Sequence, residues 1–127
     1  MALIALTQIA ATAASAAELV MLEGRACGRC KQFLAEVAPS YGATPTGRLM
    51  PLRVIDVDQS TPWFRLNGPV EGTPTFLLVD RGREIGRISG YSSREAFYAQ
   101  AQSLIAALPR KSPRRPRTHA VHAALRY

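Results

Sequence analysis

The feature that most constrains the fold is the position of the two cysteines, Cys27 and Cys30, in the stretch EGRACGRCK. An apolar run at residues 18–22 precedes the pair and stops at Gly24, which is typical of a short buried strand. After the pair, apolar residues recur at near-helical spacing, at Phe33, Leu34, Val37 and Tyr41. The cysteines are therefore predicted to lie where the first strand passes into the first helix.

The next part of the chain carries further strand patterns. Residues 42–51 are dense in turn residues and predict a loop, and residues 52–57 (LRVIDV) predict a second strand. A weak helical turn is expected around residues 63–66. Residues 75–79 (TFLLV) and 83–88 predict two more strands, which a hairpin turn at Asp80-Arg81-Gly82 joins.

A final helix completes the pattern. Ser92 and Glu95 form a capping box, which predicts the start of the helix, and Pro109 ends it. One apolar stripe runs along it, formed by Phe97, Ala101, Leu104, Ile105 and Leu108. The element order is β-α-β-(α)-β-β-α, and it predicts an α/β fold with the last helix packed on the sheet.

Composition divides the chain into three parts. Residues 1–17 carry no charge and end in small residues that fit an A-x-A cleavage site at 14–16 or at 15–17, so they predict an export signal, although no basic residue precedes the apolar run. Residues 18–109 are the predicted domain. Residues 110–127 hold six basic residues, no acidic residue and two prolines, and predict a disordered tail. Export would place the protein in an oxidising compartment, where a cysteine pair can persist as a disulfide.

The formal net charge of +7 is a property of the tail. Residues 18–109 contain ten basic and nine acidic residues, so this part of the chain is nearly neutral. The tail has one aromatic residue, Tyr127, and no recognisable binding fold. We therefore expect no nucleic-acid partner.

The residues around the cysteines suit thiol–disulfide exchange, which needs a thiolate. A free cysteine has a pKa of about 8.5, and the first turn of a helix lowers it through unpaired N–H groups and the helix dipole. We expect Cys27 to be the exposed nucleophile and Cys30 the resolving thiol. Arg25 and Arg29, the second residue of the Gly28-Arg29 dipeptide between the cysteines, supply cations that favour the thiolate. A C-x-x-C pair at a strand-to-helix junction is most often a redox motif.

Two other interpretations of the cysteines remain open. The pair can be a structural disulfide, although so short a loop closes little chain. It can also be half of a zinc site completed by His119 and His122, but the spacing from Cys30 is long and H-x2-H is tighter than usual. Neither is favoured, and we expect no metal.

A second informative stretch is GPVEGTPTFLLV, which places Thr73-Pro74 directly before a predicted strand. A cis bond here would let the turn press against the cysteine pair, so that Thr73 offers backbone groups to an extended peptide. Only about 5–6% of X-Pro bonds are cis in folded proteins. The residues alone therefore favour a trans proline at the start of an edge strand.

Taken together, these motifs resemble the thioredoxin superfamily. CGRCK is similar to the CGPCK active site of that family, and Gly72-Thr73-Pro74-Thr75 is similar to its cis-proline loop. A closer resemblance is to the exported thioredoxin-like proteins of bacterial sulfur (thiosulfate) oxidation systems, the SoxS type, carried by GTPTFLLVDRGREIGRISGY. The resemblance covers about residues 18–108.

The resemblance implies a three-layer thioredoxin-like sandwich around a mixed four-stranded sheet, with Pro74 cis and Thr73-Pro74 binding substrate. It implies a periplasmic, monomeric dithiol–disulfide oxidoreductase that needs no cofactor besides the Cys27–Cys30 pair. Its partners would be a protein thiol or disulfide such as a sulfur carrier, and a membrane thiol transporter as electron donor. The alternative is a redox-inert adaptor that binds a partner through the Thr73-Pro74 groove.

Three positions depart from the family pattern. Ala26 stands where general thioredoxins have tryptophan, and Arg29 replaces the proline between the cysteines. Met21 occupies the position of the buried aspartate that relays protons to the resolving thiol, and Glu23 is the nearest carboxylate in sequence that can substitute.

Overall fold

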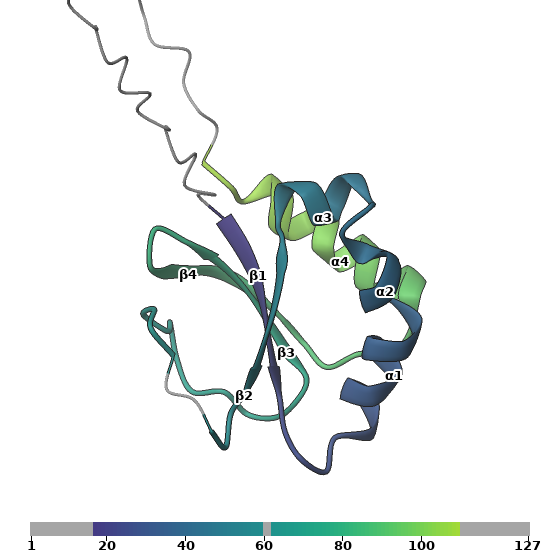
Figure 1. The fold of residues 1–127 in the computed structure, drawn as a ribbon. Helices are drawn as coiled ribbons and strands as arrows, with labels where there is room; N and C mark the ends of the chain where they lie inside the picture. Colours follow the sequence, from purple (N-terminus) through teal and green to yellow (C-terminus); the bar gives the residue numbers. More distant parts are fainter. Residues whose placement is uncertain (1–16, 60–61, 110–127) are drawn as a thin grey trace, which may run out of the picture.

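The computed structural model describes residues 17–59 and 62–109. Eight elements follow one another along the chain (Figure 1). They are β1 (Ala17–Glu23), α1 (Gly28–Glu36), α2 (Ala38–Tyr41), α3 (Pro45–Leu49), β2 (Leu52–Asp56), β3 (Thr75–Asp80), β4 (Arg83–Ser89) and α4 (Arg94–Ala106). The four strands predicted from the sequence are therefore confirmed, as are the first and last helices.

The strands form one mixed sheet in the order β2-β1-β3-β4. β1 runs parallel to β2 and antiparallel to β3, and β3 and β4 form an antiparallel hairpin. The hairpin turn has positive φ at Arg81 (51°) and Gly82 (75°), as a tight two-residue turn requires. The mixed α/β sheet expected from the resemblance is confirmed.

Side chains alternate between the two faces of the central strands, and each face has its own core. Leu19 and Met21 of β1 face the helices and join a core that includes Phe33 of α1 and Phe97 of α4. Figure 1 shows the helices gathered on this side of the sheet. The opposite core contains Val20, Leu22, Ile55, Phe64, Leu77 and Val79.

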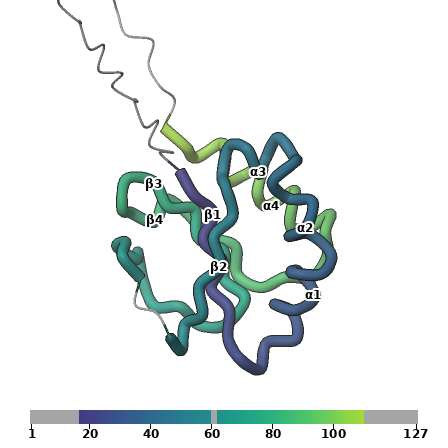
Figure 2. The backbone as a smooth tube through the Cα atoms, in the orientation of Figure 1, coloured from purple at the N-terminus to yellow at the C-terminus, as the bar shows by residue number. Residues whose placement is uncertain are grey.

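The third layer of the fold has no helix in its described part. Phe64, Leu66 and Val70 lie in the segment between β2 and β3 and pack on the opposite core. The tube in Figure 2 follows this segment along the side of the sheet away from the helices. The helical turn expected around residues 63–66 is wrong, because Arg65 instead forms a parallel bridge to Arg83.

Two short helices follow α1: α2 continues the first helical segment, and α3 lies within the loop predicted for residues 42–51. Pro39 lies in the first turn of α2, so the helical segment breaks at Val37 and continues in a new direction. Thr44 caps α3, and its side chain accepts a hydrogen bond from the Gly47 N–H at 3.0 Å. The turn residues are thus used as helix caps.

The start of the last helix is shifted by one residue from the prediction. Ser93, not Ser92, is the N-cap of α4, and its hydroxyl accepts from the Ala96 N–H at 3.1 Å. The apolar stripe is confirmed, since Phe97, Ala101 and Leu104 are buried and Ile105 and Leu108 pack beside them.

The predicted export signal and basic tail lie outside the described residues, apart from Ala17, which begins β1. His119 and His122 lie there as well. In the described ranges, no helix has the length and apolar character needed to cross a membrane.

Candidate active site

The cysteine pair lies at the junction that the sequence predicts. β1 ends at Glu23, a four-residue connection follows, and α1 begins at Gly28. Cys27 is the N-cap residue of α1, with extended backbone angles (φ −98°, ψ 94°), and Cys30 lies in its first turn. The strand and helix thus hold both sulfur atoms at one edge of the domain.

The two cysteines are joined by a disulfide with a Cα–Cα distance of 5.2 Å. Cys27 is 7% exposed and Cys30 is 2% exposed, so both are nearly buried and Cys30 lies deeper. The backbone N–H of Cys30 donates to the Cys27 sulfur at 3.0 Å. The same donor stabilises a thiolate at Cys27 when the disulfide is reduced.

The electrostatic surroundings of the pair also favour an anion. No acidic residue lies in the first turn of α1. Arg25 and Arg29 are exposed, and Arg29 donates to the side chain of Gln32 at 3.0 Å along the outer face of the helix. Arg29 is therefore a solvated cation beside the pair, and no described contact joins it to a sulfur.

The Thr73–Pro74 peptide bond is cis, as the resemblance implies. The last register pair of β1 and β3 is Leu22 with Thr75, so Thr73-Pro74 continues alongside the end of β1. A Cβ atom built on Gly24 would lie 3.3 Å from the Thr73 hydroxyl oxygen. This turn is therefore next to the connection that carries the cysteines.

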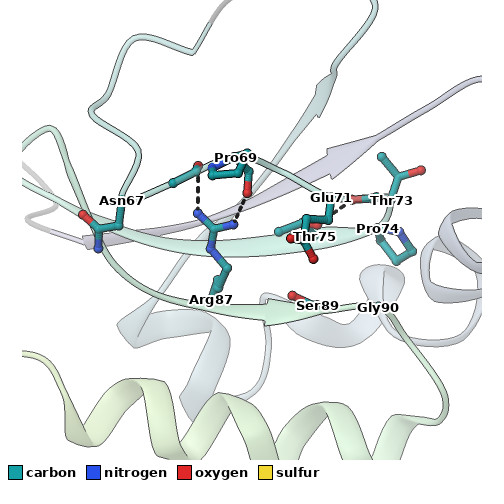
Figure 3. A pocket seen from close by; sticks show the side chains of 11 residues that line it. Asn67, Pro69, Glu71, Thr73, Pro74, Thr75, Arg87, Ser89 and Gly90 are labelled. Carbon is teal, nitrogen blue, oxygen red and sulfur yellow. Dashed lines mark hydrogen bonds between the residues drawn. The ribbon is translucent and has the colours of Figure 1, made fainter.

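A groove of about 540 Å³ opens beside Thr73 and Pro74 (Figure 3). Its walls are the segment before β3 and the outer part of β4. The lining residues are Asn67, Gly68, Pro69, Glu71, Gly72, Thr73, Pro74, Thr75, Arg87, Ser89 and Gly90.

Arg87 ties the two walls of this groove together. Its guanidinium donates to the carbonyl of Pro69 at 2.8 Å and to that of Gly68 at 3.3 Å. It also binds both carboxylate oxygens of Glu84, with Nη2 to Oε2 at 2.8 Å. Figure 3 shows Arg87 reaching from β4 to the Pro69 segment.

Glu84 is the buried half of this ion pair, with a side chain only 2% exposed. Burial raises the pKa of Glu84, but hydrogen bonds from Arg87 and from the Asn67 N–H outweigh it, and the pKa is lowered. Glu84 and Arg87 share a face because a register shift occurs in β4, where Leu78 pairs with Gly86 and Val79 with Glu84. This pair could not be predicted from the sequence, because no sequence signal marks the shift.

Below the cysteines the site is apolar. Met21 is fully buried and belongs to the same core as Cys27 and Cys30. Phe33, one turn after Cys30, packs edge-on against Phe76 at 4.6 Å and against Phe97 at 4.9 Å between ring centroids. The buried position that general thioredoxins fill with an aspartate is therefore apolar in this protein. Glu23 lies at the end of β1, where it pairs in register with Asp56 of β2.

Tyr91 packs in the helix-side core and also makes a polar contact. Its hydroxyl donates to the Glu36 carboxylate at 2.6 Å, which joins the end of α1 to the segment before α4. Burial and this contact raise the pKa of Tyr91 to about 12, and the hydrogen bond from Tyr91 lowers the pKa of Glu36.

Within the described ranges, no group of three or more His, Cys, Asp or Glu side chains could hold a metal ion.

The sheet order, the first-turn cysteine pair and the adjacent cis-proline turn define a thioredoxin-type protein. The chain belongs to the thioredoxin-like domain family, whose model matches residues 5–105. It is similar to the periplasmic thioredoxin SoxS from Paracoccus pantotrophus, with 35% identity and a TM-score of 0.68. That match covers 72% of this chain and 97% of SoxS, and it confirms the SoxS-type resemblance.

Two further structures share the fold. The thioredoxin Mala s 13 of Malassezia sympodialis is 20% identical, covering 70% of this chain and 75% of its own, with a TM-score of 0.52. Poplar thioredoxin h (PtTrxh4) is 24% identical, covering 74% and 80%, also with a TM-score of 0.52. No curated protein gives a significant match.

Proposed function

We propose that this protein is a periplasmic thiol–disulfide oxidoreductase that reduces disulfides or sulfur adducts on a partner protein. The observation that carries the proposal is the position of Cys27 as the N-cap of α1, with the Cys30 N–H aimed at its sulfur at 3.0 Å. Cys27 is also the less deeply buried of the two residues, at 7% exposed against 2% for Cys30. A thiolate near the surface with a second thiol behind it is the arrangement that disulfide exchange requires.

The reaction begins with both cysteines reduced. The Cys27 thiolate attacks one sulfur of the partner disulfide, a mixed disulfide forms, and the other partner sulfur leaves as a thiolate. Cys30 then loses its proton and attacks the Cys27 sulfur, which releases the second partner thiolate. The protein ends as the Cys27–Cys30 disulfide, having given two electrons to the partner. A membrane thiol transporter returns the electrons.

The groove beside Thr73-Pro74 would position the partner. Among the described residues, no other backbone group forms a hydrogen bond with the N–H or C=O of Thr73, and Thr73 itself is half-buried. An extended segment can pair with such groups in the manner of an added strand. Because Gly24 lies against Thr73, a segment bound there passes close to Cys27.

The sulfur-carrier partner and the periplasmic location rest on the likeness to SoxS, which is a periplasmic thioredoxin. A carrier protein with an exposed, sulfur-modified cysteine is a substrate that Cys27 can attack by the same exchange.

Trapping tests the proposal. In Cys30→Ser the resolving step is blocked, so a mixed disulfide between Cys27 and the partner should accumulate and disappear on reduction. Cys27→Ser is the matched control and should trap nothing. If the partner instead stays bound without a covalent link in both variants, the protein is an adaptor and not a redox enzyme.

A further inference from the structure

The carboxylate of Glu71 lies in the wall of the groove beside Thr73-Pro74. Glu71 lines this groove and is exposed. In the part of the chain that the structure describes, its side chain forms no hydrogen bond or ion pair, since the two ion pairs there involve Glu18 and Glu84. Figure 3 shows Glu71 at the same end of the groove as Thr73 and Pro74. A segment that binds beside Thr73 therefore passes this carboxylate.

Arg87, the cation in the groove wall, is already neutralised within the domain. Both carboxylate oxygens of Glu84 bind its guanidinium, and two backbone carbonyls accept further hydrogen bonds from it. The hydrogen bonds with Glu84 raise the pKa of Arg87, and the charges of Glu84 and Glu71 raise it further. Two carboxylates thus share one guanidinium, and the groove keeps a net negative charge at Glu71.

The backbone on both sides of Glu71 is held in place. The Pro69 carbonyl, two residues before it, accepts a hydrogen bond from Arg87 at 2.8 Å. The Gly72 carbonyl, directly after it, accepts one from the Thr75 hydroxyl at 2.6 Å. Glu71 therefore has a defined position in the groove wall, and a charge that is already positioned costs less ordering when a ligand binds.

We propose that Glu71 selects partner segments that carry a lysine or arginine close to their reactive cysteine. The inference rests on the proposed function, because the segment must dock beside Thr73 for exchange at Cys27. Gly24 lies against Thr73, so a docked segment extends from the cysteine pair into the groove. An extended chain rises about 3.3 Å per residue, so a long basic side chain about two residues from the reactive cysteine can reach Glu71. Opposite charges across an interface favour encounter and fix the register.

The first test uses short peptide disulfides as substrates of the reduced protein. Each peptide has one cysteine, joined to a neutral thiol, with lysine or glutamine either two residues before it or two residues after it. Placing the charge on each side in turn separates the effect of Glu71 from that of Arg25 and Arg29 near the start of α1. At one of the two positions, the lysine peptide should react about threefold faster or more than the glutamine peptide. Added salt should reduce this ratio.

Variants of Glu71 show whether that carboxylate is the cause. Glu71→Gln should bring the lysine-to-glutamine rate ratio to about one, and Glu71→Lys should bring it below one. Glu95→Gln is the matched control, since it removes an exposed carboxylate from the first turn of α4, and it should keep the ratio of the parent. A ratio of about one in the parent at both positions, or equal ratios in the parent and Glu71→Gln, would overturn the proposal.

Failure of the proposed function gives a different result, because the parent would then reduce none of the peptides. Binding decides the proposal in that case. The lysine peptide, with serine in place of its cysteine, is titrated into the parent and into Glu71→Gln, and the amide NMR shifts of Gly72 and Ser89 are followed. Binding that is about threefold weaker or more in Glu71→Gln would support recognition by charge. Equal binding, or no shifts in the parent, would contradict it.

Discussion

Glu84, which is buried, and Arg87, which is partly exposed, form an ion pair across one face of β4, although they are three residues apart in a strand. A regular strand would direct them to opposite faces. The register shift at Val79 brings them together, and Arg87 then holds the carbonyls of Gly68 and Pro69. The groove beside Thr73-Pro74 thus depends on a strand irregularity at some distance in sequence.

Removal of the arginine is predicted to be more damaging than removal of both charges. Arg87→Met leaves the Glu84 carboxylate buried without its partner and should cost about 3–5 kcal/mol in the free energy of unfolding. The double variant Glu84→Gln with Arg87→Met should be less destabilised than Arg87→Met alone. Denaturant unfolding of the parent, Glu84→Gln, Arg87→Met and the double variant measures the coupling between the two side chains. Purely additive losses of stability would contradict that coupling.

The same ion pair makes the free energy of unfolding depend on pH in the acid range. The pKa of Glu84 is lowered from its ordinary value of 4.5, so the folded state binds this proton less tightly than the unfolded state. Its contribution is complete above pH 4.5 and is lost as the pH falls through the folded pKa. Glu84→Gln should flatten the stability profile in that acid range, and an unchanged profile would count against the ion pair.

Gly47 is predicted to tolerate no side chain. A Cβ atom there would lie 1.9 Å from the carbonyl oxygen of Tyr41, a backbone atom that cannot move aside alone. Gly47→Ala should therefore destabilise the domain by about 1–3 kcal/mol or more. Gly42→Ala is the control, because its Cβ would meet nothing within 4 Å, and it should be close to neutral. Similar melting temperatures for the two variants would contradict the packing of α3.

Tyr91→Phe is predicted to raise the pKa of Glu36. The hydroxyl of Tyr91 is the largest contributor to the lowered pKa of that carboxylate, so its loss returns the pKa toward 4.5. The stability loss should be about 0.5–1.5 kcal/mol, as for an ordinary hydrogen bond. Carboxyl NMR titration measures the first effect. Tyr98→Phe is the matched control, since its ring packs on Phe97 while no hydroxyl contact to Glu36 is present, and it should leave Glu36 unchanged.

The sequence predicts the strands, the first and last helices and the position of the cysteines because each follows from apolar periodicity and turn residues within a short window. Pro74 could be predicted as cis only through the family resemblance. Three features escaped prediction for one physical reason, namely that each depends on contacts distant in the chain. They are the helix α3, whose Thr46 accepts a hydrogen bond from Gln102 of α4, the shifted register of β4, and the segment at residues 62–74 that covers the sheet without a helix.

The central claim is that the helix start and the Cys30 N–H hold Cys27 ionised near neutral pH. The most direct measurement is the pH dependence of thiolate absorbance at 240 nm in Cys30→Ser, where Cys27 is the only thiol. A pKa of about 7, well below the roughly 8.5 of free cysteine, is expected. A thiol that titrates at about 8.5 or above would contradict the mechanism.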